Sequence, residues 1–259
     1  MIVFIKMSII LIIKEKAMIN EQQAQNNGQI RGSGLVPESG NIKGQTWSSK
    51  EELALGIWVY HDVLPKELDL INRIEDVLTD EKSFYNWLPA YVGYQQLMPE
   101  YRDCVDFKFK KTDIEHDPSE ASKKLQKIWQ DCFDRKKAVV DDYTRNYRLG
   151  ELRYWEAMNF VKYGPGQHFQ EHHDHGYSYN CTVSMVAYIN DDYDGGELFF
   201  RYQGLNLKPK AGDLFIFPSN FVYPHRAMPV HDGLKYSIVT MLDYSAKFHT
   251  AEMFQETGD

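Results

Sequence analysis

The residues with the clearest chemical potential lie in the run Glu171-His172-His173-Asp174-His175, which is followed much later by His225. Side chains alternate between the two faces of a strand, so His172 and Asp174 can point into one cavity. Two histidines and one carboxylate form the facial triad of non-haem Fe(II) oxygenases, which leaves metal positions open for other ligands. The spacing therefore predicts an iron site made by His172, Asp174 and His225.

The same alternation allows a second ligand set on the opposite face of the strand. Glu171, His173 and His175 would form it, and a set of one Glu and two His is better suited to Zn²⁺. A solvated, His-rich loop is a third interpretation. It is disfavoured because a turn at residues 163–166 precedes the cluster and strand-like segments follow it. The residues alone leave the choice between the two ligand sets open.

Lys235 is the second residue whose position suggests chemistry. It lies ten positions after His225 in the strand-like run KYSIVTML, with Ser237 on the same face. A cation inside a barrel is costly to bury without an anion. A dicarboxylate co-substrate extending inward from the metal would supply that anion. The competing interpretations are an internal Asp or Glu partner and a lysine that faces solvent, but together with the histidine cluster Lys235 favours the dicarboxylate.

A β-rich second half would position these residues. Many short strands separated by Gly, Asn, Asp and Pro predict a β-sandwich or barrel. They run from about Tyr154 to Tyr244 as YWEAMNFVKY, TVSMVAYIN, GELFFRY, DLFIFPS and KYSIVTMLDY. Four aromatic residues in these strands are candidates for the pocket wall, although plain barrel core is expected for most of them: Tyr188, Phe200, Phe215 and Phe217.

The first half carries helical patterns that we expect to pack against this barrel. A strand is predicted at Ile57–Leu64, a helix opened by Pro65, a strand at Asp106–Lys111, and a long polar helix from Asp117 towards Tyr147. We therefore predict a flexible leader at residues 1–48, one domain at 49–247 and a tail at 248–259. Within the domain, residues 49–152 are expected to give helical support and residues 153–247 the catalytic barrel core.

The composition of the chain limits the kinds of partner that we expect it to bind. The 259 residues carry a formal net charge of −8, so no broad basic field is available for a nucleic-acid backbone. Cys104, Cys132 and Cys181 are far apart and predict free thiols in a reducing, cytoplasmic setting. The apolar start MIVFIKMSIILII is interrupted by Lys6 and Ser8 and is shorter than the roughly 20 residues of a membrane span. Neither a nucleic acid nor a membrane is expected as a partner.

Two longer runs resemble a known family. Residues 163–174, YGPGQHFQEHHD, are similar to the Tyr-x-x-Gly-x-x-aromatic-x-x-His-x-Asp run of the prolyl 4-hydroxylase-like branch of the 2-oxoglutarate and Fe(II)-dependent dioxygenases. Residues 225–237, HRAMPVHDGLKYS, resemble its His-x-x-x-Pro-Val-x-x-Gly-x-Lys run. YDGGEL at 193–198 and KPKAGDLFIFPS at 208–219 are similar as well. The resemblance covers about residues 155–245 and selects the first of the two metal-ligand sets.

The resemblance implies a fold, cofactors and roles. The fold is a double-stranded β-helix, a jelly-roll barrel of the cupin-like kind, flanked by N-terminal helices. The cofactors are Fe(II), the co-substrate 2-oxoglutarate and also L-ascorbate. The implied metal ligands are His172, Asp174 and His225. The implied contacts to 2-oxoglutarate are Lys235, Ser237 and Tyr163.

The implied activity is hydroxylation of an unactivated C–H, in a prolyl or other residue of a peptide or protein, with O2 consumed and succinate and CO2 released. Ser184 and Leu198 stand where that branch frequently carries threonine. Two alternatives stay open. One is a hydroxylase of the same fold that acts on a small molecule such as a free amino acid. The other is a non-catalytic cupin-like metal-binding module, which would not need Lys235.

Overall fold

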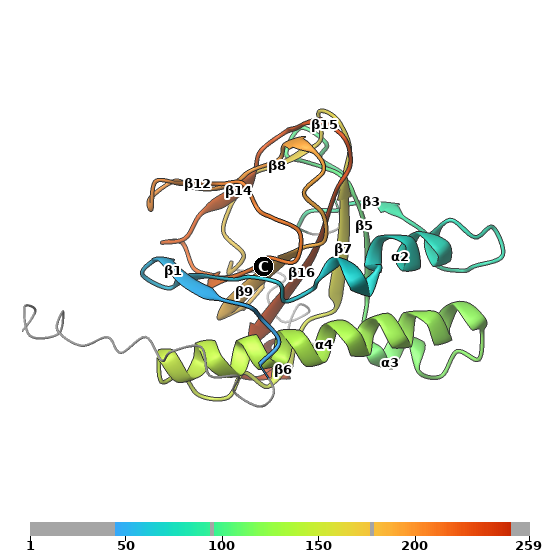
Figure 1. The fold of residues 1–259 in the computed structure, drawn as a ribbon, viewed down its shortest axis with the longest axis horizontal. Helices are drawn as coiled ribbons and strands as arrows, with labels where there is room; N and C mark the ends of the chain where they lie inside the picture. The colour runs from blue at the N-terminus through green and yellow to red at the C-terminus, as the bar shows by residue number, and fades with distance from the viewer. Residues whose placement is uncertain (1–44, 94–95, 177–178, 250–259) are drawn as a thin grey trace, which may run out of the picture. The chain divides into compact units, whose positions relative to one another are not determined.

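The structure is a computed structural model that describes residues 45–93, 96–176 and 179–249 (Figure 1). Residues 1–44 of the predicted leader, which include the apolar start, lie outside this description, as do residues 250–259 of the predicted tail. Among the described residues, no helix is both long enough and apolar enough to cross a membrane.

The larger of two main sheets draws strands from both halves of the chain. Neighbouring strands pair antiparallel, and β6 (Tyr154–Trp155) joins β16 beside the main path. The order along the sheet is β1 (Lys50–Ala54), β2 (Ile57–Tyr60), β13 (Leu214–Pro218), β9 (Val183–Tyr188), β16 (Lys235–Asp243), β7 (Met158–Tyr163), β5 (Val105–Phe109) and β3 (Leu88–Pro89).

The smaller sheet faces the larger one and closes the barrel. Its order is β12 (Leu205–Leu207), β11 (Leu198–Phe200), β14 (His225–Ala227), β8 (His168–His172) and β4 (Arg102–Asp103). A separate pair is formed by β10 (Asp194–Gly195) and β15 (Val230–Asp232). In Figure 1, β8, β12 and β14 lie on one side of β9 and β16, and the long helix α4 lies on the other. The predicted double-stranded β-helix flanked by helices is confirmed.

The helices differ from the expectation in one place. The helix predicted after Pro65 is divided into a 3-10 turn, Lys66–Leu68, and α2 (Leu70–Leu78). The division falls at Asp69, whose φ of 49° is left-handed and interrupts helical geometry. The remaining helical elements are α3 (Lys111–Ile114), α4 (Glu120–Asn146) and a 3-10 turn at Ala246–His249.

The long helix α4 begins where the sequence predicts. Ser119 is its N-cap, and the Ser119 hydroxyl accepts a hydrogen bond of 3.1 Å from the Ser122 amide. Residues of α2 and α4 pack with the outer face of the larger sheet in the main apolar core. The support at residues 49–152 is not only helical, because β1 to β5 lie in this range and join the sheets. Two of these strands, β2 and β5, lie where the sequence predicts strands, and β1, β3 and β4 are additional.

The side chains of β16 alternate between the apolar core under the helices and the cavity between the sheets. Tyr236, Ile238 and Leu242 belong to the core shared with the helices. Lys235 and Ser237 point to the opposite side and line a cavity between the sheets. The strand therefore anchors the helices with one face and supplies polar groups to the barrel interior with the other.

Lys136 is a buried cation in the helix-facing core. It lies on α4, is fully buried, and its ammonium donates to the Thr240 hydroxyl of β16. Burial lowers the pKa of Lys136 from 10.5 to about 8. The unfolded chain therefore holds this proton more tightly than the folded chain. The resulting penalty, on the order of 3 kcal/mol, is full below the folded pKa and is relieved as the pH rises towards the unfolded value.

Replacing this cation should stabilise the protein. Lys136→Met should raise the free energy of unfolding at neutral pH by about 2 kcal/mol and should remove the gain in stability at alkaline pH. Chemical denaturation at neutral pH and near the unfolded pKa of lysine measures both effects. Lys137→Met, at a half-exposed lysine paired with Asp141, is the matched control. A less stable Lys136→Met variant at neutral pH would show that the buried charge is compensated.

Candidate metal centre and its cavity

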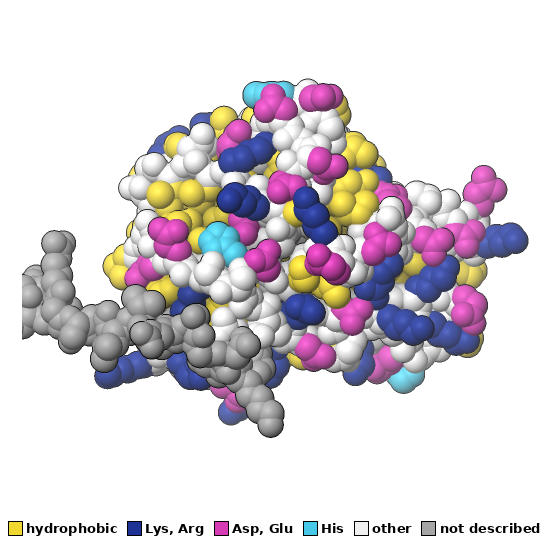
Figure 2. Space-filling view, in the orientation of Figure 1, with side chains coloured by type: hydrophobic (Ala, Val, Ile, Leu, Met, Phe, Trp, Pro, Cys, Tyr) yellow, Lys and Arg dark blue, Asp and Glu magenta, His cyan; other side chains and the backbone are white. Residues whose placement is uncertain are grey.

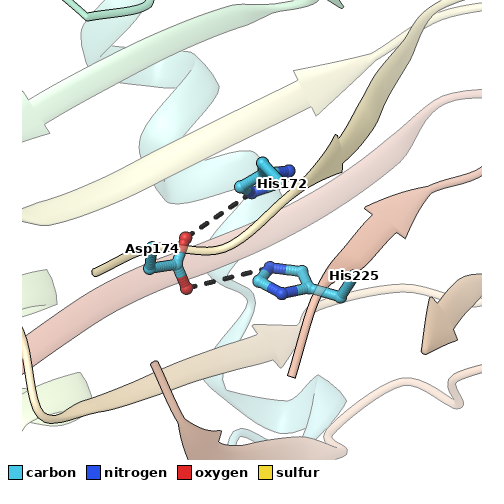
Figure 3. A group of neighbouring side chains, drawn as sticks. All are labelled: His172, Asp174 and His225. Carbon is cyan, nitrogen blue, oxygen red and sulfur yellow. Dashed lines mark ion pairs between the residues drawn. The ribbon is translucent and has the colours of Figure 1, made fainter. Parts of the chain in front are cut away.

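The three predicted metal ligands come together at one end of the smaller sheet (Figure 3). His172 ends β8, His225 begins β14, and the two residues lie opposite each other in the antiparallel pair. Asp174 lies two residues beyond the end of β8, yet its carboxylate faces both imidazoles. Asp174 Oδ1 is 3.5 Å from His172 Nε2, and Oδ2 is 3.8 Å from His225 Nε2.

Backbone hydrogen bonds fix the orientation of both imidazoles. The Nδ1 atom of His172 lies 2.8 Å from the carbonyl oxygen of Gln170, and that of His225 lies 3.2 Å from the carbonyl oxygen of Tyr223. A carbonyl oxygen only accepts, so Nδ1 carries the proton in each ring. Each Nε2 atom then presents its lone pair towards Asp174, which is the arrangement that metal-binding histidines adopt.

The donor set fits a divalent metal ion. One ligand atom from each of His172, Asp174 and His225 lies within 4.8 Å of the others. Ligands about 2.1 Å from a metal and at right angles to one another stand about 3 Å apart, so modest inward movement of the side chains is sufficient. The set consists of two imidazole nitrogens and one carboxylate, and it is open on the side of the cavity. Such an open set is typical of a catalytic Fe(II) site, whereas a structural metal site is closed by protein ligands on all sides.

Aromatic rings hold the two histidines in place. Phe169 stacks on His172 with ring centroids 3.7 Å apart, and Phe217 meets His225 edge-on at 4.8 Å. Of the four aromatic candidates for the pocket wall, Tyr188 lines the cavity. The other three lie in the apolar core behind it, as expected for most of this set: Phe200, Phe215 and Phe217.

The protonation states are those that metal binding requires. Burial opposes ionisation of Asp174, but His225 and His172 outweigh it and hold the pKa of Asp174 well below its usual range. Burial lowers the pKa of His225 to about 4, although Asp174 acts in the opposite direction. A carboxylate and a neutral imidazole are therefore present at neutral pH, so no proton has to leave these two groups before a metal binds.

Ser184 supports the metal cluster, and the sequence did not indicate this role for it. Its hydroxyl lies 2.7 Å from that of Ser219, and it also helps to lower the pKa of Asp174. In the sequence, Ser184 stood out only as a departure from a frequent threonine. The structure places it in β9 on the side of the metal cluster, so a hydroxyl is retained at this position.

The alternative ligand set does not converge. Glu171 forms an ion pair with Arg201, with Oε2 and Nε 2.8 Å apart. The Nδ1 atom of His175 lies 2.9 Å from the carbonyl oxygen of Cys181, and His173 is exposed at the rim of the cavity. The three side chains that were proposed for Zn²⁺ thus point to different partners.

A cavity of about 720 Å³ opens between the two sheets and contains the metal cluster. The three residues that the resemblance implies for 2-oxoglutarate line it as well: Tyr163, Lys235 and Ser237. Lys235 pairs with Tyr163 across β16 and β7, and Ser237 follows on the same face of β16. Val161, Val186 and Val239 give the cavity an apolar floor around these polar groups.

Lys235 has no carboxylate partner among the described residues. It is only 1% exposed, and its Nζ donates a hydrogen bond of 2.8 Å to the carbonyl oxygen of Gly196 and lies 4.9 Å from the ring of Tyr163. Burial and the nearby Lys208 lower the pKa of Lys235 to about 7. The internal Asp or Glu partner and the solvent-facing lysine, both considered as alternatives, are not what the structure shows.

The Gly195-Gly196 pair makes room for this lysine. Both residues have positive φ, 70° and 67°. A Cβ atom at Gly195 would lie 2.4 Å from the carbonyl oxygen of Pro229, and one at Gly196 would lie 3.0 Å from the Lys235 side chain. The glycines of the GGEL run therefore allow close approach around Lys235.

A polar wall of the cavity was missed by sequence reasoning. Arg102 Nη2 donates to Asp106 Oδ2 at 2.8 Å, and Asn159 Nδ2 donates to the same oxygen at 3.2 Å. Arg102 also lies over the ring of Phe169 at 5.0 Å. The sequence did contain one indication of this wall. Asn159 is a polar residue inside the otherwise apolar strand MNFVKY, where a side chain is expected to be buried.

A family match covers the same region. Residues 158–242 match the 2OG-Fe(II) oxygenase superfamily, and this range contains all six predicted site residues. The "Putative prolyl 4-hydroxylase" of Acanthamoeba polyphaga mimivirus is 30% identical over 101 residues, 31% of this chain and 42% of that protein. Human "Procollagen-lysine,2-oxoglutarate 5-dioxygenase 2" is 27% identical over 110 residues, 41% of this chain and 14% of that protein. The chain thus spans less than half of the length of either relative.

Solved structures show the same fold. A Trichoplax adhaerens prolyl hydroxylase in complex with a peptide fragment matches with a TM-score of 0.57 at 13% identity, over 73% of this chain and 83% of that one. A Pseudomonas putida prolyl-4-hydroxylase matches with a TM-score of 0.52 at 21% identity, over 73% and 92%. Residues 158–242 thus match the 2OG-Fe(II) oxygenase superfamily, and the chain shares the fold of these two prolyl hydroxylases over about three quarters of its length.

Proposed function

We propose that this protein is an Fe(II)- and 2-oxoglutarate-dependent dioxygenase that hydroxylates an unactivated C–H in a peptide or protein residue. One observation carries the proposal. The metal-binding cluster and a buried lysine without a carboxylate partner line the same cavity. A metal-binding module would explain the cluster alone, whereas the buried Lys235, which forms no ion pair among the described residues, favours an anion that comes from outside the chain.

In this proposal, His172, Asp174 and His225 hold the iron and Lys235 holds the far carboxylate of 2-oxoglutarate. The bound Fe(II) supplies the O2 chemistry that couples decarboxylation of 2-oxoglutarate to oxygen insertion into a C–H bond. Tyr163 and Ser237 supply hydroxyl groups beside Lys235 for the same carboxylate. The hydrogen bonds of the two Nδ1 atoms to backbone carbonyls keep the imidazoles oriented.

The apolar floor contributes by excluding water. Val161 pairs with Ser237, Val186 pairs with Val239, and all three valines line the cavity, so the co-substrate would meet a dry section of the wall. In a dry section, the attraction between Lys235 and a carboxylate is stronger than in water. L-ascorbate would act as a reductant that keeps the iron in its ferrous state.

The substrate class rests on the relatives. Two relatives are named as prolyl hydroxylases, and a third is named for procollagen lysine. These names favour an amino-acid residue within a peptide as the substrate of this protein. Charge argues against a nucleic acid, since the chain carries −8, and acidic and basic side chains intermingle on the face shown in Figure 2.

Consumption of 2-oxoglutarate tests the proposal. The full chain with Fe(II), ascorbate and 2-oxoglutarate should form succinate slowly on its own and faster with an accepted peptide, and the peptide should gain one oxygen atom. Succinate is measured by mass spectrometry, with omission of Fe(II) as the control. The candidate substrates are prolyl peptides, lysyl peptides and free amino acids. If Fe(II) binds but 2-oxoglutarate is not consumed, either alone or with any of these substrates, the protein is better described as a non-catalytic metal-binding module.

A further inference from the structure

The cavity has a buried lysine near one end and a glutamate near the other. Lys235 and Met241 both line it from β16, six residues apart, which corresponds to about 20 Å along a strand. At the Met241 end, the backbone amide of Glu156 donates to the Met241 carbonyl at 2.9 Å, and the Glu156 side chain lines the cavity. A cation and a carboxylate thus lie near opposite ends of one cavity.

The metal cluster lies between these ends. Ser184 pairs with Met241 across β9 and β16 and also acts on Asp174, so the cluster is nearer to the Met241 end. The charge of Asp174 also acts on Glu156 and helps to raise its pKa. In the proposed function, 2-oxoglutarate extends from the metal towards Lys235. Glu156 then lies beyond the metal, on the side that is left for the primary substrate.

The Glu156 carboxylate has no ion-pair partner among the described residues. Burial raises the pKa of Glu156, and Lys108 offsets this effect without forming an ion pair. The Tyr179 hydroxyl is buried beside this carboxylate and acts on it as a hydrogen-bond donor, which also opposes the rise in the pKa of Glu156. A desolvated charge without an ion-pair partner is costly, both for the Glu156 carboxylate and for the Lys235 ammonium at the other end. Neither residue forms an ion pair within the described structure, although Lys108 acts on Glu156 and Glu197 acts on Lys235 from a distance.

We infer that Glu156, with Tyr179, is a binding site for an alkylammonium group of the primary substrate. This inference rests on the proposed function, which it deepens by naming the substrate chemistry. The carboxylate accepts two of the three ammonium hydrogens and the Tyr179 hydroxyl accepts the third. A lysyl side chain in a peptide and free lysine both offer this group. With the ammonium held beyond the metal, a C–H of the same alkyl chain faces the iron.

The first test is direct binding of matched peptides to the full chain. Three peptides differ only at a central lysine, norleucine or proline, and a fourth probe is free lysine. Calorimetry should give the lysine peptide an affinity at least tenfold higher than that of the norleucine peptide, because the two differ only in the ammonium group. Tighter binding of free lysine than of the lysine peptide would assign the site to the free amino acid. Equal affinity for the lysine and norleucine peptides overturns the inference.

The second test changes the carboxylate. Glu156→Gln should weaken binding of the lysine peptide at least tenfold and should leave the norleucine peptide unaffected. Glu151→Gln is the matched control, because Glu151 is 74% exposed and pairs with Arg153 on the surface. Glu156→Lys should reverse the preference towards a peptide with a central glutamate. Unchanged selectivity in both Glu156 variants overturns the role of Glu156.

Turnover separates this inference from the proposed function. If the wild-type chain consumes 2-oxoglutarate and the lysine peptide accelerates succinate formation no more than the norleucine peptide, the ammonium site is wrong and the dioxygenase stands. If the lysine peptide binds selectively and no 2-oxoglutarate is consumed under any condition, the ammonium site stands and the proposed function fails.

Discussion

Asp174→Ala should abolish Fe(II)-dependent consumption of 2-oxoglutarate, with a loss of succinate formation of about a thousandfold or more. Asp174 is the only carboxylate in the ligand cluster of the described structure, and it faces both imidazoles at 3.5 and 3.8 Å. Without it, two neutral imidazoles would share the metal, and the affinity for a hard divalent cation would fall. Succinate is quantified at saturating Fe(II) and 2-oxoglutarate.

A surface carboxylate provides the control for this variant. Asp194→Ala removes an exposed Asp that pairs with His231, and it should keep most of the wild-type turnover. His172→Ala should behave like Asp174→Ala, because it removes a second ligand of the same cluster. Circular dichroism shows whether each variant is folded. Folded Asp174→Ala protein that still forms succinate at the wild-type rate would exclude this carboxylate as an iron ligand.

Lys235→Ala should raise the KM for 2-oxoglutarate about a hundredfold and change kcat much less. Removing one partner of a buried charge pair costs several kcal/mol, and a contact far from the reacting atoms contributes mainly to uniform binding. Lys210→Ala, at an exposed lysine, is the control. A KM for 2-oxoglutarate that is unchanged in Lys235→Ala would remove this residue from the co-substrate site.

The pH dependence gives an independent check of the same contact. Burial and Lys208 lower the pKa of Lys235 to about 7 before any ligand binds, so the ammonium form is lost as the pH rises through this value. The dicarboxylate needs the charged form. Its affinity should therefore be highest below about pH 7 and fall as the pH rises, with uptake of a proton on binding. This dependence should be absent in Lys235→Ala.

Local spacing was enough to single out the histidine-rich run and Lys235 as candidates, but it did not select the ligand set. His172 and Asp174 are two residues apart, and alternation along a strand brings them to one face even though Asp174 lies just past the end of β8. His225 needed the order of the family's motifs as well, because its contact with His172 depends on the pairing of β14 with β8. The choice between the two ligand sets also came from the resemblance.

The residues that were missed depend on which distant strands become neighbours. Arg102, Asp106 and Asn159 belong to three strands, and only pairing of β5 with β7 and of β4 with β8 brings them together. Glu156 is similar, since its place in the cavity follows from the contact with Met241. The strands of the first half were underestimated because each is short and gives a weak periodic signal.

Anaerobic calorimetry with Fe(II) and 2-oxoglutarate tests the central claim most directly, since it needs no knowledge of the substrate. We expect one Fe(II) per chain and a tight 2-oxoglutarate site that depends on that metal. Loss of metal binding in Asp174→Ala and loss of 2-oxoglutarate binding alone in Lys235→Ala would match the proposed geometry. Binding of 2-oxoglutarate that is equally tight without Fe(II), or Fe(II) binding that survives in Asp174→Ala, would contradict it.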